Sequence, residues 1–112
     1  MIIYEEEYRV KTAKIKEWEK NLLEFDKIIK SLDAPFLKGW YVWQDKFVPG
    51  LIKNVWVLDE LSDVDRLREL CLVKTPEWAD MVPRIFETMI DGTYKVSFWK
   101  PVSNEDIVAS LK

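Results

Sequence analysis

The sequence contains no histidine and a single cysteine, Cys71. Without histidine, the chain lacks the side chain that most often acts as a general base near neutral pH and the usual nitrogen ligand of zinc and haem. One cysteine can form neither a disulfide within the chain nor a cysteine-cluster metal site. Because Cys71 lies in an apolar helical pattern, we interpret it as a packed thiol rather than a reactive one. We therefore expect no metal site and no cofactor.

Long apolar runs and basic blocks are also missing. No stretch approaches the ~20 apolar residues of a membrane span, and the N-terminus lacks the apolar core of a signal peptide. The formal net charge is −3, with lysines interleaved among acidic residues, so no basic stripe indicates nucleic-acid binding. Lys and Glu are abundant beside few Asn and Gln, a bias found in thermophile proteins. These features predict a cytoplasmic protein without membrane or nucleic-acid partners.

The chain length sets the domain organisation that we expect. With 112 residues, of which 48% are hydrophobic, there is enough sequence for one core and too little for two. We expect one domain over residues 1–101 and a tail over residues 102–112 that can form a short helix from Ser103.

The periodicity of apolar residues predicts an alternation of strands and helices. Alternating residues predict strands at 2–10, 36–43, 51–58 and 93–99, and spacings of three and four predict helices at 12–32, 61–72 and from 75 to about 90. The second and third strands flank a loop with Pro49 and Gly50 and form a hairpin. The order is β-α-β-β-α-β with a split second helical region. This predicts an α+β, ferredoxin-like fold with a four-stranded antiparallel sheet.

The segment KTPEWADMVP divides that second helical region. Asp59 or Ser62 is available to cap the helix before it, and Thr75 is a suitable N-cap for the helix after it. Pro76 fits the first helical position, and Pro83 must kink or restart the helix. Trp78 shares an apolar stripe with Val82 and Ile85, so we interpret it as a packing anchor.

The two faces of the predicted sheet differ in character. One face is apolar and suited to cover by helices: Ile2, Tyr4, Tyr8, Val10, Tyr94, Val96 and Phe98. We expect the opposite face to mix charges with aromatic residues: Glu5, Glu7, Arg9, Lys38, Trp40, Val42, Asn54, Trp56, Leu58, Lys95, Ser97 and Trp99. Tryptophan carries a large area that favours burial, so this face predicts a homodimer formed through the sheets.

Three segments resemble NIPSNAP-like domains of the dimeric α+β barrel superfamily. They are YRVK ending the first strand with Tyr8, VWVLDELSDVDR at residues 55–66, and TPEW at residues 75–78. In that family a strand carrying a Trp runs into a short helix start, and an Asp-Pro-Glu-Trp-like segment opens the last helix. Thr75 replaces the Asp here, and Tyr4, Glu5 and Glu6 stand where the family has a Glu-Leu-Arg-type segment.

The resemblance implies both a fold and a general type of function. In the superfamily, two sheets form a barrel across a dimer, and a cavity between sheet and helices, or the barrel interior, holds small molecules. Some relatives degrade haem, oxidise quinol-like compounds or isomerise small lactones, and several of these depend on histidine. Their sites cannot be transferred to a chain without histidine.

Two groups of residues are candidates for function. Glu5 and Glu7, on one strand face, can provide a general base with a raised pKa if enclosed, or can pair with Arg9, Lys95 or Lys38. The second group can stack on a flat ligand and hydrogen-bond to it, or can form the core of a dimer interface. It comprises Trp40, Asn54, Trp56, Lys95 and Trp99.

These observations lead to one hypothesis with two alternatives. The sequence predicts a NIPSNAP-like dimeric barrel protein that binds a small apolar or aromatic molecule in a cavity. The first alternative is a cofactor-independent monooxygenase or isomerase acting on a small aromatic substrate. The second is a homodimer with a structural or interaction role. The sequence alone leaves open whether the protein is an enzyme.

Overall fold

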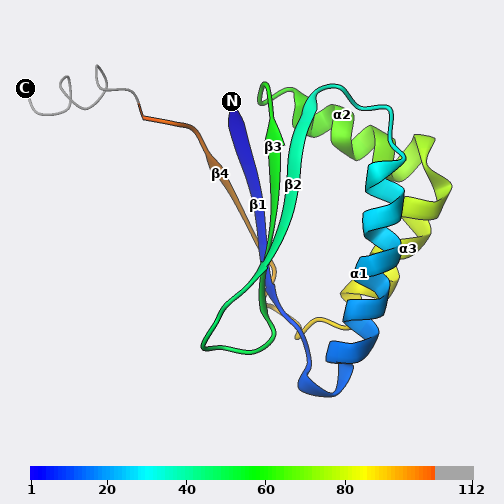
Figure 1. The fold of residues 1–112 in the computed structure, drawn as a ribbon, viewed down its shortest axis with the longest axis vertical. Coiled ribbons are helices and arrows are strands. Elements are labelled where there is room, and N and C mark those ends of the chain that lie inside the picture. Colours follow the sequence, from blue (N-terminus) through cyan, green and yellow to red (C-terminus); the bar gives the residue numbers. More distant parts are fainter. Residues whose placement is uncertain (103–112) are drawn as a thin grey trace, which may run out of the picture.

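A four-stranded antiparallel sheet is covered on one face by helices in the computed structural model, which describes residues 1–102 (Figure 1). The elements are β1 (Ile2–Arg9), η1 (Thr12–Lys14), α1 (Ile15–Lys30), β2 (Leu37–Gln44), β3 (Leu51–Leu58), α2 (Asp63–Glu69), η2 (Leu70–Lys74), α3 (Pro76–Phe86) and β4 (Lys95–Trp99). The strand order β2-β3-β1-β4 places β1 and β3 in the centre. The α+β, ferredoxin-like arrangement is therefore confirmed. The helix expected from Ser103 lies outside the described residues.

The inner face of the sheet, which is the face turned to the helices, follows the alternation predicted for β1. Tyr4, Tyr8 and Val10 are all buried there. On the neighbouring edge strand, Phe98 lies opposite Tyr4, and the two rings stack with their centroids 5.3 Å apart. Glu6 shares this phase of β1, so a carboxylate stands in the middle of an otherwise apolar and aromatic row.

The predicted phase of the hairpin was wrong. Trp56 lies directly opposite Tyr4, and Asn54 opposite Glu6, so both belong to the inner face. Trp40 lies opposite Trp56 and is therefore also on the inner face. The run LIKNVWVL is apolar in both phases, so alternation could not decide which residues face the helices. Two further residues of the expected outer face, Val42 and Leu58, also face the helices, and Lys38 lies at an irregularity in the β2–β3 register.

The outer face of the sheet is nevertheless mixed in character. Glu5 and Glu7 lie beside Lys53 of β3, with carboxylate oxygens 3.6 and 3.9 Å from its ammonium nitrogen. Tyr41, Trp43 and Trp99 are more than half exposed, which places three large aromatic side chains on this face or its edges.

The second helical region is split by a change in helix type and then by Thr75. The chain passes from α2 through a π-helical turn, η2, and restarts as α3 at Pro76. Ser62 and Thr75 stand at the N-cap positions, as predicted, but neither side chain makes a capping hydrogen bond. The Thr75 carbonyl accepts from the N–H groups of Trp78 and Ala79. At the start of α2, Asp63 accepts from the Glu60 N–H instead. Within residues 1–102, no helix is both long and apolar enough to cross a membrane.

Trp78 connects α3 to the sheet. Only 3% of its surface is exposed, and its ring lies 5.7 Å from that of Trp56 at an interplanar angle of 20°. Phe25 of α1 meets both indoles edge-on. These rings join α1, α3 and β3 in the main core cluster, so Trp78 is a packing residue as expected.

Candidate functional site

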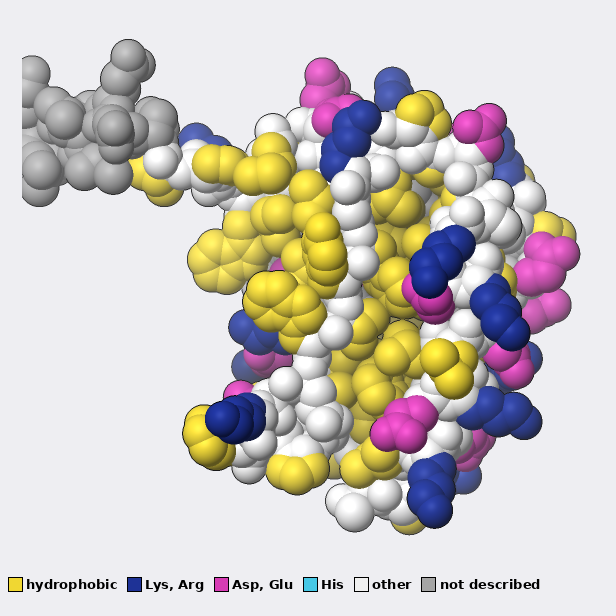
Figure 2. Space-filling view, viewed as in Figure 1, with side chains coloured by type: hydrophobic (Ala, Val, Ile, Leu, Met, Phe, Trp, Pro, Cys, Tyr) yellow, Lys and Arg dark blue, Asp and Glu magenta, His cyan; other side chains and the backbone are white. Residues whose placement is uncertain are grey.

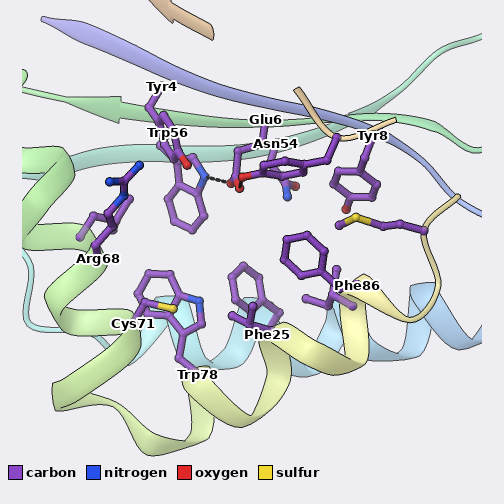
Figure 3. A pocket seen from close by; sticks show the side chains of 15 residues that line it. Tyr4, Glu6, Tyr8, Phe25, Asn54, Trp56, Arg68, Cys71, Trp78 and Phe86 are labelled. Atoms are coloured by element: carbon purple, nitrogen blue, oxygen red, sulfur yellow. Dashed lines mark hydrogen bonds between the residues drawn. The ribbon is translucent and has the colours of Figure 1, made fainter. Parts of the chain in front are cut away.

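A cavity of about 190 Å³ lies between the inner face of the sheet and the helices. Figure 2 shows hydrophobic side chains filling the region where the sheet and the helices approach each other. Figure 3 shows the cavity itself, with β1 and β3 along one side and the helices along the other. The site is therefore built from the two central strands and the layer that covers them.

The floor of the cavity is set by strand register. Tyr4, Glu6 and Tyr8 follow one another on the inner face of β1, with ~7 Å between successive members. Trp56 and Asn54 lie opposite Tyr4 and Glu6 on β3. The floor therefore has an aromatic end and a polar centre in which a carboxylate stands beside an amide.

Glu6 is held in place by two hydrogen bonds from aromatic side chains. The Trp56 indole Nε1–H donates to Glu6 Oε1 over 2.7 Å, and the Tyr94 hydroxyl donates to Glu6 Oε2. Within residues 1–102, Glu6 forms no ion pair. The cavity thus contains a carboxylate that is oriented by neutral donors and has no cation beside it.

One atom of the Asn54 side chain, Oδ1, has no hydrogen-bond partner among the described residues. This side chain is 9% exposed, and its Oδ1 atom is buried without a hydrogen bond from any described residue. A buried amide oxygen of this kind costs roughly 1–3 kcal/mol unless a donor reaches it. Asn54 is therefore a feature that packing alone does not explain.

The roof of the cavity is aromatic and apolar except at one end. Phe25, Trp78 and Phe86 face the floor from α1 and α3 (Figure 3). Arg68 lines the opposite end from Tyr8, beside Tyr4 and Trp56, and its side chain is exposed. A guanidinium group therefore stands at the edge of an otherwise hydrophobic cavity.

The environment changes the acidity of several lining groups. Burial raises the pKa of the Tyr8 hydroxyl to about 12, although Trp18 donates a hydrogen bond to its oxygen. Burial, followed by the charge and the hydrogen bond of Glu6, raises the pKa of Tyr94 far above its usual range. Burial and then Glu6 raise the pKa of the Cys71 thiol to about 11. At neutral pH these groups are protonated, so none is an activated nucleophile or base.

The five residues predicted to bind a ligand lie on two faces of the sheet. Asn54 and Trp56 line the cavity, and Trp40 lines a second hollow between α1 and β2. Lys95 and Trp99 lie on the outer face. The structure therefore does not bring the five together.

Glu5 and Glu7, the predicted candidates for a base, are also on the outer face. Both lie near Lys53, which was not among the partners named from the sequence. Neither lines the cavity. Across residues 1–102, no cluster of three or more acidic or cysteine side chains is arranged to hold a metal ion.

Sequence reasoning missed Glu6, Arg68 and Tyr94 as cavity residues. A signal for Glu6 was present, because it interrupts the apolar phase of Tyr4, Tyr8 and Val10 in β1. Arg68 had no such signal, since one arginine on the exposed side of a helix is ordinary.

Several solved structures of other proteins share the fold of this chain. A structure titled antibiotic biosynthesis monooxygenase superposes with a TM-score of 0.72 at 16% identity, covering 92% of this chain and all of that chain. A NIPSNAP family protein from Agrobacterium tumefaciens gives a TM-score of 0.73 at 19% identity, covering 95% of this chain and 90% of that one. This chain therefore shares the fold of these two proteins.

An uncharacterised NIPSNAP domain protein from Burkholderia xenovorans has the same fold. It gives a TM-score of 0.68 at 23% identity and covers 93% of this chain and 97% of that chain. No protein-family model and no curated protein matches the sequence. The fold implied by the resemblance is confirmed, and at these identities the likeness concerns the fold.

Proposed function

We propose that this protein binds one small aromatic molecule in the cavity between the sheet and the helices. The observation that carries the proposal is a preformed cavity of about 190 Å³ with aromatic walls and two polar groups on its floor, the partly buried Glu6 and the buried Asn54. Binding sites for small molecules typically combine apolar walls with a few oriented polar groups. A cavity of about 150 Å³ can hold benzene, so one substituted ring is the appropriate ligand size.

The test is to block the cavity and compare binding of a neutral aromatic compound. Val82 lines the cavity from α3, so Val82→Phe places a ring into the space. We expect phenol to bind the unchanged protein in calorimetric titration and to lose binding to Val82→Phe. The matched control is Val73→Phe, because Val73 is 71% exposed on η2 and is not among the lining residues.

Two outcomes would contradict the proposal. Phenol could fail to bind the unchanged protein, or it could bind Val82→Phe as well as it binds Val73→Phe. Thermal unfolding of both variants shows whether they remain folded, because overpacking costs roughly 1–3 kcal/mol.

The enzymatic alternative, a cofactor-independent monooxygenase or isomerase, has less support from the cavity. Glu5 and Glu7 face away from the cavity and lie near Lys53. Inside the cavity, Glu6 already accepts two hydrogen bonds, and the tyrosines and Cys71 are protonated at neutral pH. Binding is therefore the function that this geometry favours.

We also propose that the protein is a homodimer through the outer face of its sheet. Tyr41, Trp43 and Trp99 are 51%, 62% and 56% exposed there or at its edges. These residues lie on the two edge strands, β2 and β4, and exposed aromatic side chains on one face are typical of protein interfaces. Lys95, on the same face as Trp99, would then be a contact of the interface rather than of the ligand. Sedimentation at micromolar concentration tests this proposal.

A further inference from the structure

Two opposite charges border the cavity, and neither forms an ion pair with another residue of the described part of the chain. Glu6 is on the floor, and Arg68 stands at the end beside Tyr4 and Trp56 (Figure 3). Within residues 1–102, neither side chain is paired with an oppositely charged group, and the two are not paired with each other. The two charged groups differ in whether their hydrogen bonds are already satisfied.

Glu6 has its hydrogen bonds already. Each of its oxygens accepts from an aromatic side chain, Trp56 on one side and Tyr94 on the other. Arg68 makes no hydrogen bond or ion pair to an acidic side chain of the described residues, and its planar fork of N–H groups matches a carboxylate. The nearby Tyr4 hydroxyl senses this charge: burial and then Glu6 raise its pKa, and Arg68 lowers it. Because Glu6 acts on Tyr4 more strongly than Arg68 does, the case for an anion at this end rests on the Arg68 fork, which forms no ion pair with a described residue.

The centre of the cavity floor, in contrast, lacks a hydrogen-bond donor. Asn54 Oδ1 is a buried acceptor without a donor, and Asn54 lies opposite Glu6 in the register of β1 and β3. The strand position of Tyr4 is ~7 Å from that of Glu6, since it is two residues along β1. This separation suits one aromatic ring with a small substituent at each end.

Resting on the proposed function, we propose that the ligand is a planar aromatic carboxylic acid that also carries a hydroxyl or amino donor across the ring. Its carboxylate pairs with the Arg68 guanidinium at the edge of the cavity. Its ring lies in the cavity beside the packed rings of Phe25, Trp56 and Trp78, not between them. Its donor reaches Asn54 Oδ1 and satisfies the buried amide oxygen.

Four related compounds separate the parts of this inference: 4-hydroxybenzoate, 4-methoxybenzoate, phenol and tyramine. The first carries both groups, the second lacks the donor, the third lacks the carboxylate, and the fourth has an ethylammonium group in place of the carboxylate. We expect 4-hydroxybenzoate to bind about tenfold or more tightly than phenol and than 4-methoxybenzoate in calorimetric titrations at neutral pH. Tyramine should bind no better than phenol.

Variants assign each preference to a residue. Arg68→Met keeps the length of the side chain and removes its charge, so 4-hydroxybenzoate should lose its advantage over phenol in this variant. Lys74→Met is the matched control, because it removes a positive charge from the end of η2 outside the cavity. Asn54→Leu should abolish the advantage of the hydroxyl over the methoxy compound.

The failure of this inference is distinguishable from that of the proposed function. If phenol binds and 4-hydroxybenzoate binds no more tightly, or if its advantage survives in Arg68→Met, the inference is overturned and the aromatic site stands. Tighter binding of tyramine would also overturn it, because Glu6 would then select the ligand charge. If none of the four compounds binds, both proposals fail. Arg68 is exposed, so Arg68→Met tests the choice of an anion even if Asn54→Leu does not fold.

Discussion

Glu6 occupies a position of β1 at which its neighbours of the same phase, Tyr4 and Tyr8, are buried. A charged group in such a place must be hydrogen-bonded or paired if it is to be tolerated. Trp56 and Tyr94 supply the hydrogen bonds, and both belong to the cavity wall. At the residue scale, aromatic side chains therefore do two things here: they form apolar walls, and their polar edges orient the one carboxylate.

Tyr8 gives a prediction for alkaline pH. Burial raises the pKa of its hydroxyl from 10.0 to about 12, so the folded chain holds this proton more tightly than the unfolded chain does. The resulting contribution to the free energy of unfolding is complete below pH 10 and is lost as the pH rises towards 12. Its size is on the order of 2–3 kcal/mol. Urea unfolding at several pH values between 8 and 12 should therefore show a decline for the unchanged protein.

The control for this prediction is another tyrosine. Tyr8→Phe should show a shallower decline over the same interval, whereas Tyr41→Phe, altered at a half-exposed ring, should follow the unchanged protein. Equal pH dependence in all three proteins would contradict the assignment to Tyr8.

Some of these residues could be identified from the sequence and others could not. The phase of Tyr4 and Tyr8 followed from alternation, because the outward residues of β1 include Glu5, Glu7 and Arg9. Glu6 was readable as an exception to that phase but was not recognised. The unpartnered state of Asn54 depends on every group around it, so no local pattern could have predicted it.

At the scale of elements, the chain order was predicted well and the sheet phases only in part. Helix α1 has a clear stripe, and the break at Thr75 and Pro76 follows from local backbone chemistry. In β3, both phases are apolar, and only pairing with β1 determines that Trp56 faces inward. Because Trp56 and Asn54 line the cavity, the site was divided wrongly between the two faces of the sheet.

Pro83 gives a prediction for α3. The sequence predicted a kink or a restart at this residue. The helix does not restart, because α3 runs from Pro76 to Phe86 as one element with Pro83 inside it. Proline cannot donate a hydrogen bond to the carbonyl four residues earlier, here that of Ala79, and its ring is exposed. Pro83→Ala should therefore raise the free energy of unfolding by about 1–3 kcal/mol in urea denaturation.

The matched control is the other proline of the same helix. Pro76 is at the first position of α3, where the missing N–H has no intrahelical partner in any case. Pro76→Ala should change stability little or lower it slightly. A loss of stability in Pro83→Ala would show that the ring contributes packing or chain rigidity that outweighs the restored hydrogen bond.

At the scale of the whole molecule, the two sheet faces have separate proposed uses. The inner face forms the floor of the ligand cavity, and the outer face carries the aromatic residues proposed for the dimer. If this division holds, Trp43→Asp should be a monomer in sedimentation experiments in which the unchanged protein is a dimer. The substitution places a charge on the outer face at a position that is 62% exposed.

Leu72→Asp is the control for the dimer prediction. Leu72 is 68% exposed on η2, in the helical layer, and a charge there should leave the dimer intact. Sedimentation of the unchanged protein as a folded monomer at micromolar concentration would end the dimer proposal. Phenol titration of the Trp43→Asp monomer then tells whether ligand binding requires the partner chain.

The place of β1 in the sheet has a consequence for how the chain folds. This first strand is central, and Ile3 pairs with Val57 on one side and with Trp99 on the other. Contacts between residues so distant in sequence slow folding, because long loops must close before the pairing stabilises them. During synthesis, one edge of β1 stays unpaired until β4 has been made, and open strand edges are prone to non-native pairing. The β1 half of the cavity floor is thus made before β3 and β4 and keeps one open edge until β4 pairs with it.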